Sequence, residues 1–177
     1  MKKLLLVLIA VMSLVLILNL SLFAQDEKVA HKSFYSEIGG PGVLMSANFD
    51  SRFSSDSQFG FGYRVGIGYL YGEYSNDYVE RAYFTIPVGL NYIFGKPDSV
   101  HSFEIGTGTT LLPRKAEIYY YGNSDNKKLS YALGFFTFMY RRTPEGGGFS
   151  WRIGLTPLID RYGDIFPMGS FSIGFIF

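Results

Sequence analysis

Large apolar residues alternate with glycine along residues 59–71. Every odd position in this segment carries Phe, Tyr, Val or Ile. The even positions between them carry mainly glycine: Gly60, Gly62, Arg64, Gly66, Gly68 and Leu70. Successive side chains of a β-strand point to opposite faces of a sheet, so a period of two predicts a strand with one bulky face and one nearly bare face.

The same alternation recurs along most of the chain, whereas helical periodicity is weak. It predicts further strands near residues 34–38, 43–53, 83–93, 101–111, 129–141, 149–155 and 171–177. The segment 129–141 is apolar on both faces, so its orientation is left open. Gly39-Gly40-Pro41-Gly42 separates the first two segments. Glycine permits positive φ and proline lacks a ladder donor, so this tetrapeptide is either a tight turn between two strands or a kink in one long strand.

The bulky strand faces indicate whether the outside of this fold meets water or lipid. In a soluble β-domain the apolar face points inward and the polar face meets water. Here aromatic residues make up 18% of the chain and there are 21 glycines, so the polar faces are too bare for an ordinary wet surface. We expect the bulky faces to meet lipid and the small faces to line a narrow interior. An isolated buried charge is costly, so four charged residues are expected to pair inside: Glu37, Arg64, Glu104 and Arg152. The alternative is a soluble sandwich on which these residues are ordinary surface charges.

The segments between strands fit a barrel. Bacterial single-chain barrels have an even strand number, short periplasmic turns and longer outer loops. Counting back from a periplasmic C-terminus places residues 72–80, 113–128 and 160–167 outside. The shorter segments 54–57, 95–100 and 143–148 then fall on the periplasmic side. Residues 34–38 supply the eighth strand, although they are short against the roughly 9–11 residues expected of a spanning strand.

The predicted fold is therefore all-β: a closed, antiparallel, up-and-down transmembrane β-barrel of eight strands. Pro87 and Pro157 lie inside or near the ends of predicted strands. A closed barrel has no edge strand on which a missing donor is harmless, so each proline is expected at a bulge or a strand end.

A leader precedes the barrel. Met1-Lys2-Lys3 is followed by an apolar run over residues 4–23 and by Ala24. This order of positive start, apolar middle and small residue is that of a signal peptide, cleaved after Ala24. We therefore assign residues 1–24 to the signal peptide and residues 25–177 to the barrel. A retained anchor is the alternative, because roughly 20 apolar residues can span a bilayer.

Charge and residue types exclude several functions. After residue 24 the chain holds fourteen basic and fifteen acidic residues, which does not resemble the basic patch of a nucleic-acid-binding protein. Cysteine is absent and only two histidines occur, His31 and His101. We therefore expect no disulfide framework, no metal site and no cofactor.

Catalysis by a serine–histidine–acid triad is a second possibility. Ser99, His101, Ser102 and Glu104 lie within six residues of one another. In a strand, however, His101 and Ser102 point to opposite faces. We expect no enzyme here, and a lipid-modifying enzyme of the outer membrane, of the lipid A deacylase or acyltransferase type, is kept as the alternative. A soluble, secreted barrel that binds a small ligand is the second alternative.

Pore formation and surface binding are the remaining classes. Eight strands leave an interior that side chains nearly fill, so no general pore is expected. The predicted outer loop 113–128 carries basic and tyrosine side chains that could meet lipopolysaccharide phosphates or the membrane interface: Arg114, Lys115, Tyr119, Tyr120, Tyr121, Lys127 and Lys128. An ordinary solvated loop is the alternative.

The C-terminal octapeptide Ser170-Phe171-Ser172-Ile173-Gly174-Phe175-Ile176-Phe177 resembles the sorting signal of outer-membrane barrels. This resemblance implies that Phe171, Ile173, Phe175 and Phe177 are recognised by the barrel-assembly machinery. Residues 25–177 also resemble the small outer-membrane barrels of Bacteroidetes-type bacteria, through the phrases at residues 34–42 and 85–96. That resemblance implies an integral outer-membrane location and the barrel fold, and it says almost nothing about function. We expect lipid, including lipopolysaccharide, as a partner and a structural or surface-interaction role.

Overall fold

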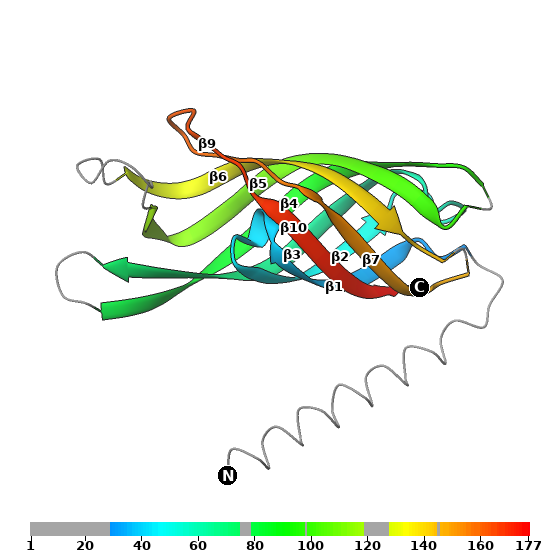
Figure 1. The fold of residues 1–177 in the computed structure, drawn as a ribbon, viewed down its shortest axis with the longest axis horizontal. Coiled ribbons are helices and arrows are strands. Elements are labelled where there is room, and N and C mark those ends of the chain that lie inside the picture. The colour runs from blue at the N-terminus through cyan, green and yellow to red at the C-terminus, as the bar shows by residue number, and fades with distance from the viewer. Residues whose placement is uncertain (1–28, 75–78, 98, 119–127, 145) are drawn as a thin grey trace, which may run out of the picture.

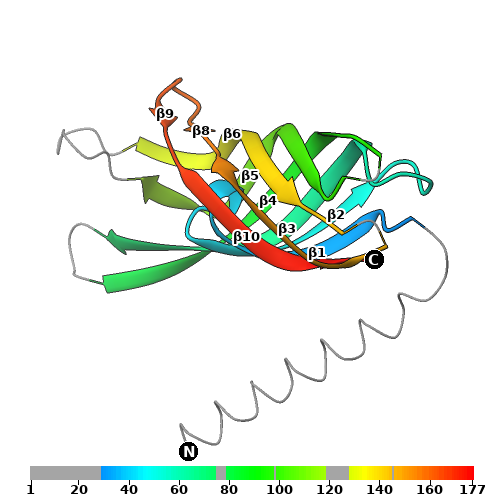
Figure 2. The same cartoon turned by 45° about the vertical axis from the view of Figure 1, so that its right-hand side comes forward.

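The chain folds into one closed antiparallel β-barrel of eight strands (Figures 1 and 2). The structure is a computed structural model that describes residues 29–74, 79–97, 99–118, 128–144 and 146–177. The assigned leader, residues 1–24, lies outside these residues. Within them, no helical segment has the length and hydropathy that a membrane-crossing helix requires.

The eight barrel strands follow one another around the wall in the order of the sequence. β5 pairs with β6, and β6 pairs with β7, which continues the ring on this side. Their bounds are β1 Lys32–Gly39, β2 Met45–Arg52, β3 Gly60–Tyr74, β4 Val79–Gly95, β5 His101–Ile118, β6 Lys128–Arg142, β7 Gly148–Leu155 and β10 Gly169–Ile176. β1 pairs with β10, which leaves no open edge. The predicted closed eight-stranded barrel is thereby confirmed, and its first strand is a separate one.

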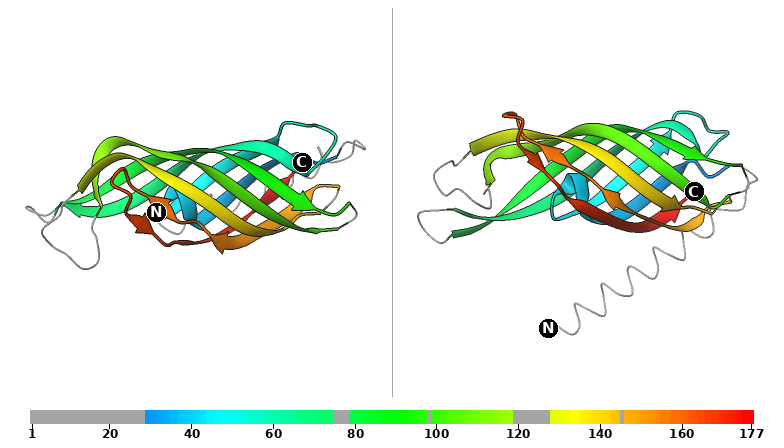
Figure 3. Two further views of the ribbon diagram at one scale, coloured as in Figure 1. Left: turned by 90° about the horizontal axis from the view of Figure 1, so that it is seen from above. Right: turned by 45° about the horizontal axis from the view of Figure 1, so that its top comes forward.

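The two ends of the barrel differ. At one end, which we call the terminal end, the N–H of Lys32 donates to the carbonyl of Phe177 at 2.9 Å, and the N–H of Phe177 donates back at 2.7 Å. At the other, the hairpin end, the long pairs β3–β4 and β5–β6 extend past the shorter strands β1, β2, β7 and β10 (Figure 3). One wall of the barrel is therefore much taller than the other.

This tall wall corrects two predicted loops. β5 continues to Ile118 and β6 begins at Lys128, so residues 113–118 and 128 belong to strands and not to the loop predicted over 113–128. Similarly, β3 continues to Tyr74 and β4 begins at Val79, which shortens the loop predicted over 72–80. In the sequence these segments are rich in charged, polar and tyrosine residues and resemble loops, so the alternation pattern did not reveal the strand extensions.

The predicted loop 160–167 also contains strand residues. A small hairpin of β8 (Leu158–Ile159) and β9 (Ile165–Phe166) continues from β7 and pairs with β6. Pro157 lies in the break between β7 and β8, at a strand end as expected, and its carbonyl accepts a hydrogen bond from Phe136 N–H at 3.1 Å. Figure 1 shows this hairpin projecting from the barrel wall.

Pro87 contradicts the expectation of a bulge or strand end. It lies inside β4, and the register with β5 is unbroken, with Pro87 opposite Thr110. Toward β3, pairing stops at Val65 opposite Val88 and resumes in the same register at Gly68 opposite Thr85. The N–H group that Pro87 lacks therefore coincides with a local gap in the β3–β4 hydrogen bonds, but the register of the two strands does not change. The register shift occurs elsewhere, in the span of β5 between Leu111 and Ala116 that contains Pro113.

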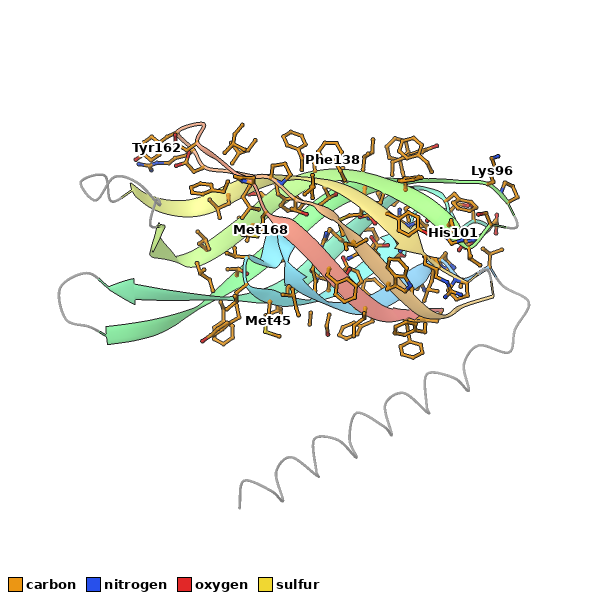
Figure 4. All side chains as sticks on the ribbon, in the orientation of Figure 1. Met45, Lys96, His101, Phe138, Tyr162 and Met168 are labelled. Carbon is orange, nitrogen blue, oxygen red and sulfur yellow. The ribbon has the colours of Figure 1, made fainter. Side chains whose placement is uncertain are left out.

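The outer surface is apolar, and most of the buried polar side chains face the lumen. Of the described residues, twenty-seven large hydrophobic side chains are exposed, whereas twenty-three polar or charged residues are buried. Met45 and Phe138, both more than half exposed, point away from the barrel axis in Figure 4. The orientation of β6, which the sequence left open, follows from its buried odd positions: Leu133, Phe135, Thr137, Met139 and Arg141 face the lumen.

Bare glycine positions make room for large lumenal side chains. A Cβ added at Gly108 would meet the Val88 carbonyl and would lie 2.5 Å from Cζ of Phe135. Phe135 is 1% exposed and fills the lumen opposite this glycine. The glycine on the inner face of β5 is therefore required by a close approach of backbone and ring.

We expect Gly108→Ala to destabilise the barrel by roughly 1–3 kcal/mol, the usual cost of forcing extra atoms into a packed interior. Gly146→Ala is the matched control, because a Cβ at Gly146 meets nothing within 4 Å. Equilibrium urea unfolding of the two variants in the same detergent or lipid would measure the difference. Equal stabilities would contradict the close packing described for Gly108.

Candidate functional site

The lumen near the hairpin end is filled by an apolar cluster. Its buried members come from β5, β6 and β8, and further side chains from β3, β9, the β1–β2 turn and the segment between β9 and β10 pack against them: Leu112, Leu133, Phe135 and Leu158, with Val43, Leu70, Phe166 and Met168. Apolar side chains from several walls therefore meet across the lumen and close it at this level.

The β1–β2 turn folds into the same lumen. Its 3-10 turn η1 (Gly40–Gly42) is buried. Thr85 donates a hydrogen bond to the Gly42 carbonyl at 3.0 Å, and Thr110 donates one to the Pro41 carbonyl at 2.6 Å. The tetrapeptide is thus a tight turn, held by hydroxyl groups from the opposite wall. Val43 has φ 78°, a region that a β-branched residue rarely occupies, so this turn is locally strained.

Glu37 lies below the turn and binds two arginines. Its Oε2 is 2.7 Å from Nη2 of Arg64, and its Oε1 is 3.5 Å from Nη2 of Arg152. Ser170 also donates a hydrogen bond to Oε1 at 2.8 Å. β1, β3, β7 and β10 supply these four residues, so one carboxylate connects opposite parts of the wall.

Glu104 forms the second centre of the network. Its Oε2 accepts hydrogen bonds from Nη1 of Arg141 at 2.8 Å and from Nη1 of Arg152 at 3.2 Å, and Asn91 donates to Oε1 at 3.1 Å. Arg152 therefore bridges Glu104 and Glu37, which are both 1% exposed. Charge-assisted bonds of this kind are stronger than neutral ones, so the network ties β5, β6 and β7 to β1.

Asp50 forms the third centre, near the terminal end. Its Oδ1 is 2.5 Å from Nη2 of Arg52 and 3.9 Å from Nη1 of Arg141. Asn91 connects this centre to Glu104, because it donates to both carboxylates and accepts a hydrogen bond from Arg52 at 2.7 Å. The ion pairs thus form one continuous lumenal network of four arginines and three carboxylates among the described residues.

An aromatic ring lies against the arginines. The guanidinium carbon of Arg152 is 3.6 Å from the ring centroid of Tyr35, and that of Arg64 is 5.5 Å from it. A cation over an aromatic face is attracted by the ring quadrupole. Tyr35 therefore supports the two cations that Glu37 also binds.

The structure brings together all four residues that the sequence proposed for the lumen, Glu37, Arg64, Glu104 and Arg152. It adds members that were not singled out: Tyr35, Asp50, Arg52, Asn91 and Arg141. For Asp50 and Asn91 a signal existed, because both alternate in phase with the small inner-face residues of their strands. For Arg141 there was none, because its segment is apolar on both faces. Arg52 follows Ser51, and both are buried, so simple alternation fails at that strand end.

The serine, histidine and acid residues near 101 are not brought together. His101 lies on the exposed face, where its Nδ1 is 2.5 Å from the Tyr140 hydroxyl. Ser102 and Glu104 are buried on the opposite face. The Ser99 hydroxyl accepts a hydrogen bond from the backbone N–H of His101 at 3.2 Å. The other histidine, His31, contacts the Val29 carbonyl at 3.1 Å.

The residues proposed for the outer surface are only partly described. Arg114 and Lys115 lie in the hairpin-end part of β5, and Lys128 is the first residue of β6. Tyr119, Tyr120, Tyr121 and Lys127 lie outside the described residues. The three described positions, Arg114, Lys115 and Lys128, belong to the β5–β6 pair that extends beyond the short wall.

The alternating C-terminal residues lie on the outer face of β10. Phe171, Ile173 and Phe177 are exposed, and Phe175 packs edge-on against Phe149 with centroids 6.1 Å apart. β10 pairs along its length with β1 and β7. The last strand therefore both closes the barrel and presents an apolar stripe on its outside.

Aromatic side chains gather on the outer surface toward the terminal end. Neighbouring rings contact one another across β3, β4, β5, β6, β7 and β10, with centroids between 4.6 and 6.1 Å apart. We call this set the aromatic belt: Phe61, Tyr92, Phe94, Phe103, Tyr140, Phe149, Trp151 and Phe175. His101, which stacks on Tyr140, lies at the same end in Figure 4.

The described part of the chain contains no group of three or more acidic or histidine side chains placed to bind a metal ion. Comparison with known proteins adds no family, since no family model, curated protein or solved structure matches the chain. The lumenal network and the apolar outer face are thus the features from which a function can be argued.

Proposed function

We propose that this protein is an integral β-barrel of the bacterial outer membrane with a structural or surface-interaction role, and neither an enzyme nor a general pore. The observation that carries the proposal is the inverted distribution of polarity. Phe61, Ile67, Phe84 and Phe103 are each more than 60% exposed, whereas Arg64 and Glu104 are 1% exposed. Water would penalise that outer surface, and lipid would not.

The aromatic belt supports the same placement. Outer-membrane barrels carry girdles of aromatic residues where the hydrocarbon meets the headgroups. The belt encircles much of the terminal end, and exposed aliphatic side chains of β4 such as Ile86 and Val88 lie between it and the hairpin end. We place the terminal end toward the periplasm, in line with a C-terminus on that side.

The filled lumen supports a role other than diffusion. Below the β1–β2 turn, ion pairs connect opposite walls, and at the level of the turn the apolar cluster closes the interior. An eight-stranded barrel has little interior space beyond its own side chains. The network then serves to hold the wall strands in register.

The tall wall supports a role at the outer surface. The β3–β4 and β5–β6 pairs project beyond the short wall at the end opposite the termini (Figure 3). Recognition commonly lies on segments that a rigid scaffold projects. Lipopolysaccharide is the expected neighbour of the basic residues on β5 and β6, and the barrel-assembly machinery is the expected partner of the C-terminal stripe during biogenesis.

Membrane fractionation combined with gel mobility tests this proposal. The full chain, expressed with its leader, is expected in the outer-membrane fraction, and mild detergent should extract a form that migrates faster unboiled than boiled. A closed barrel that keeps its ion network resists the gel detergent until heated, which explains the shift. Recovery in a soluble fraction, or in the inner membrane without a heat shift, would refute the proposal.

A further inference from the structure

A hollow of about 380 Å³ opens on the outer face of the barrel, across β3, β4, β5 and β6. Two rows of outward side chains border it, and the members of each row lie directly opposite one another on neighbouring strands. The row nearer the terminal end is Phe61, Tyr92, Ile105 and Phe138, and the row beyond it is Leu90, Thr107 and Phe136. Thr107 is the one small side chain among these seven, so the wall is indented where it lies.

The surface of the hollow is almost entirely apolar. The Thr107 hydroxyl donates a hydrogen bond to the Phe135 carbonyl at 3.1 Å, so its donor is already used within the chain. Asn91 borders the floor, but its amide points into the lumen, where it binds Asp50 and Glu104. A polar group placed in this hollow would lose its water without gaining a partner, which is costly. The occupant is therefore expected to be hydrocarbon.

The depth of the hollow matches one leaflet of a bilayer. Phe61 is the second residue of β3 and lies at the terminal end, where its ring contacts Tyr92 of the aromatic belt. Thr107 lies six residues after His101, where β5 begins. At about 3.3 Å per residue and a strand tilt of roughly 40°, Thr107 is about 15 Å from that end along the barrel axis. The hydrocarbon core is about 30 Å thick, so the hollow runs from the belt to the middle of the bilayer.

A second copy of the chain is a poorer match to the hollow. Stable protein interfaces involve about 20–30 residues on each side, whereas nine residues line the hollow. A single flexible hydrocarbon chain needs no such area. It gains dispersion contacts from the side chains on both sides of it, which lipid on the convex parts of the wall does not.

We propose that the hollow binds one acyl chain of a glycerophospholipid from the periplasmic leaflet. The chain enters beside Phe61 and Tyr92, lies between the two rows of side chains and ends at Thr107. This inference rests on the proposed membrane location and adds to it a bound lipid at a defined place on the wall. Because the chain is enclosed on two sides, this lipid should stay on the barrel when detergent removes its neighbours.

Native mass spectrometry tests the site on the protein expressed with its leader and extracted from the outer-membrane fraction in mild detergent. Titration with dipalmitoyl-phosphatidylethanolamine is expected to give a dominant complex of one lipid per barrel. Dihexanoyl-phosphatidylethanolamine carries the same headgroup on chains too short to span the hollow, so it should bind at least several-fold more weakly. Equal binding of the two lipids would contradict recognition through the acyl chain.

Matched variants separate this site from lipid that coats the whole wall. Thr107→Phe fills the hollow and should lower the amount of one-lipid complex at least several-fold. Thr107→Leu is the second variant if Thr107→Phe folds poorly. Ala47→Phe is the control, because it adds the same ring at an exposed position of β2 that does not line the hollow, and it should leave lipid binding unchanged. The heat shift on a gel verifies that each variant is a closed barrel.

The possible outcomes distinguish this site from the membrane location on which it rests. Equal retention of the dipalmitoyl lipid by the unsubstituted protein and both Thr107 variants, all with the heat shift, would overturn the site and leave the location standing. A two-chain mass that the Thr107 variants lose would also overturn it, because the hollow would then bind a second copy. A chain missing from the outer-membrane fraction would refute the location itself, and this inference with it.

Discussion

Glu104→Ala is expected to destabilise the barrel by about 3–5 kcal/mol, the cost of removing one partner of a buried ion pair. Glu104 is 1% exposed and binds Arg141 at 2.8 Å and Arg152 at 3.2 Å. Its loss leaves two guanidinium groups facing each other in the lumen, and Asn91 loses an acceptor. The charge imbalance of the network also grows from one positive charge to two.

Equilibrium urea unfolding, followed through Trp151, would measure this loss. Asp56→Ala is the control, because Asp56 is exposed in the turn between β2 and β3 and should change stability by at most about 0.5 kcal/mol, as surface substitutions usually do. Glu104→Gln keeps hydrogen-bonding atoms but removes the charge, so its loss should lie between the two. A Glu104→Ala barrel as stable as the Asp56→Ala barrel would contradict a structural role for the network.

Val88→Arg is expected to destabilise the barrel in a lipid bilayer by about 2–4 kcal/mol, the cost of a cation on the lipid face near the midplane. Val88 points outward from the middle of β4 and is 41% exposed. On a water-facing surface the same change would be close to neutral, within about 0.5 kcal/mol. The substitution therefore separates a lipid-facing wall from a wet one.

Ile165→Arg is the matched control for this comparison. Ile165 is 57% exposed in the small β8–β9 hairpin, which projects from the wall at the hairpin end (Figure 1). We expect it to lie outside the hydrocarbon, where the cost of a cation falls to about 0–1 kcal/mol. Unfolding of both variants in the same vesicles gives the difference. If Val88→Arg costs no more than Ile165→Arg, the wall does not face lipid at Val88, and the proposed location fails.

The sequence by itself determined the strand pattern and which residues share a face. Alternation between bulky residues and glycine at 59–71 is a local property, because successive side chains of a strand point to opposite sides whatever the strand packs against. The same parity placed Arg64, Glu104, Arg152 and Glu37 together on inner faces, and the short segment 34–38 completed the eight strands. Strand ends were less well predicted, because β5 and β6 continue through residues that look like a loop.

Only the tertiary structure decided how the lumen is filled. β6 is apolar on both faces, so the inward position of Phe135 and Arg141 follows from its pairing with β5 and β7 and not from its own pattern. Whether Gly39–Gly42 bends or turns depended on Thr85 and Thr110, which lie far along the chain and supply its hydrogen bonds. Which arginine meets which carboxylate depends on the stagger of eight strands around a closed ring, and parity within one strand carries no information about that stagger.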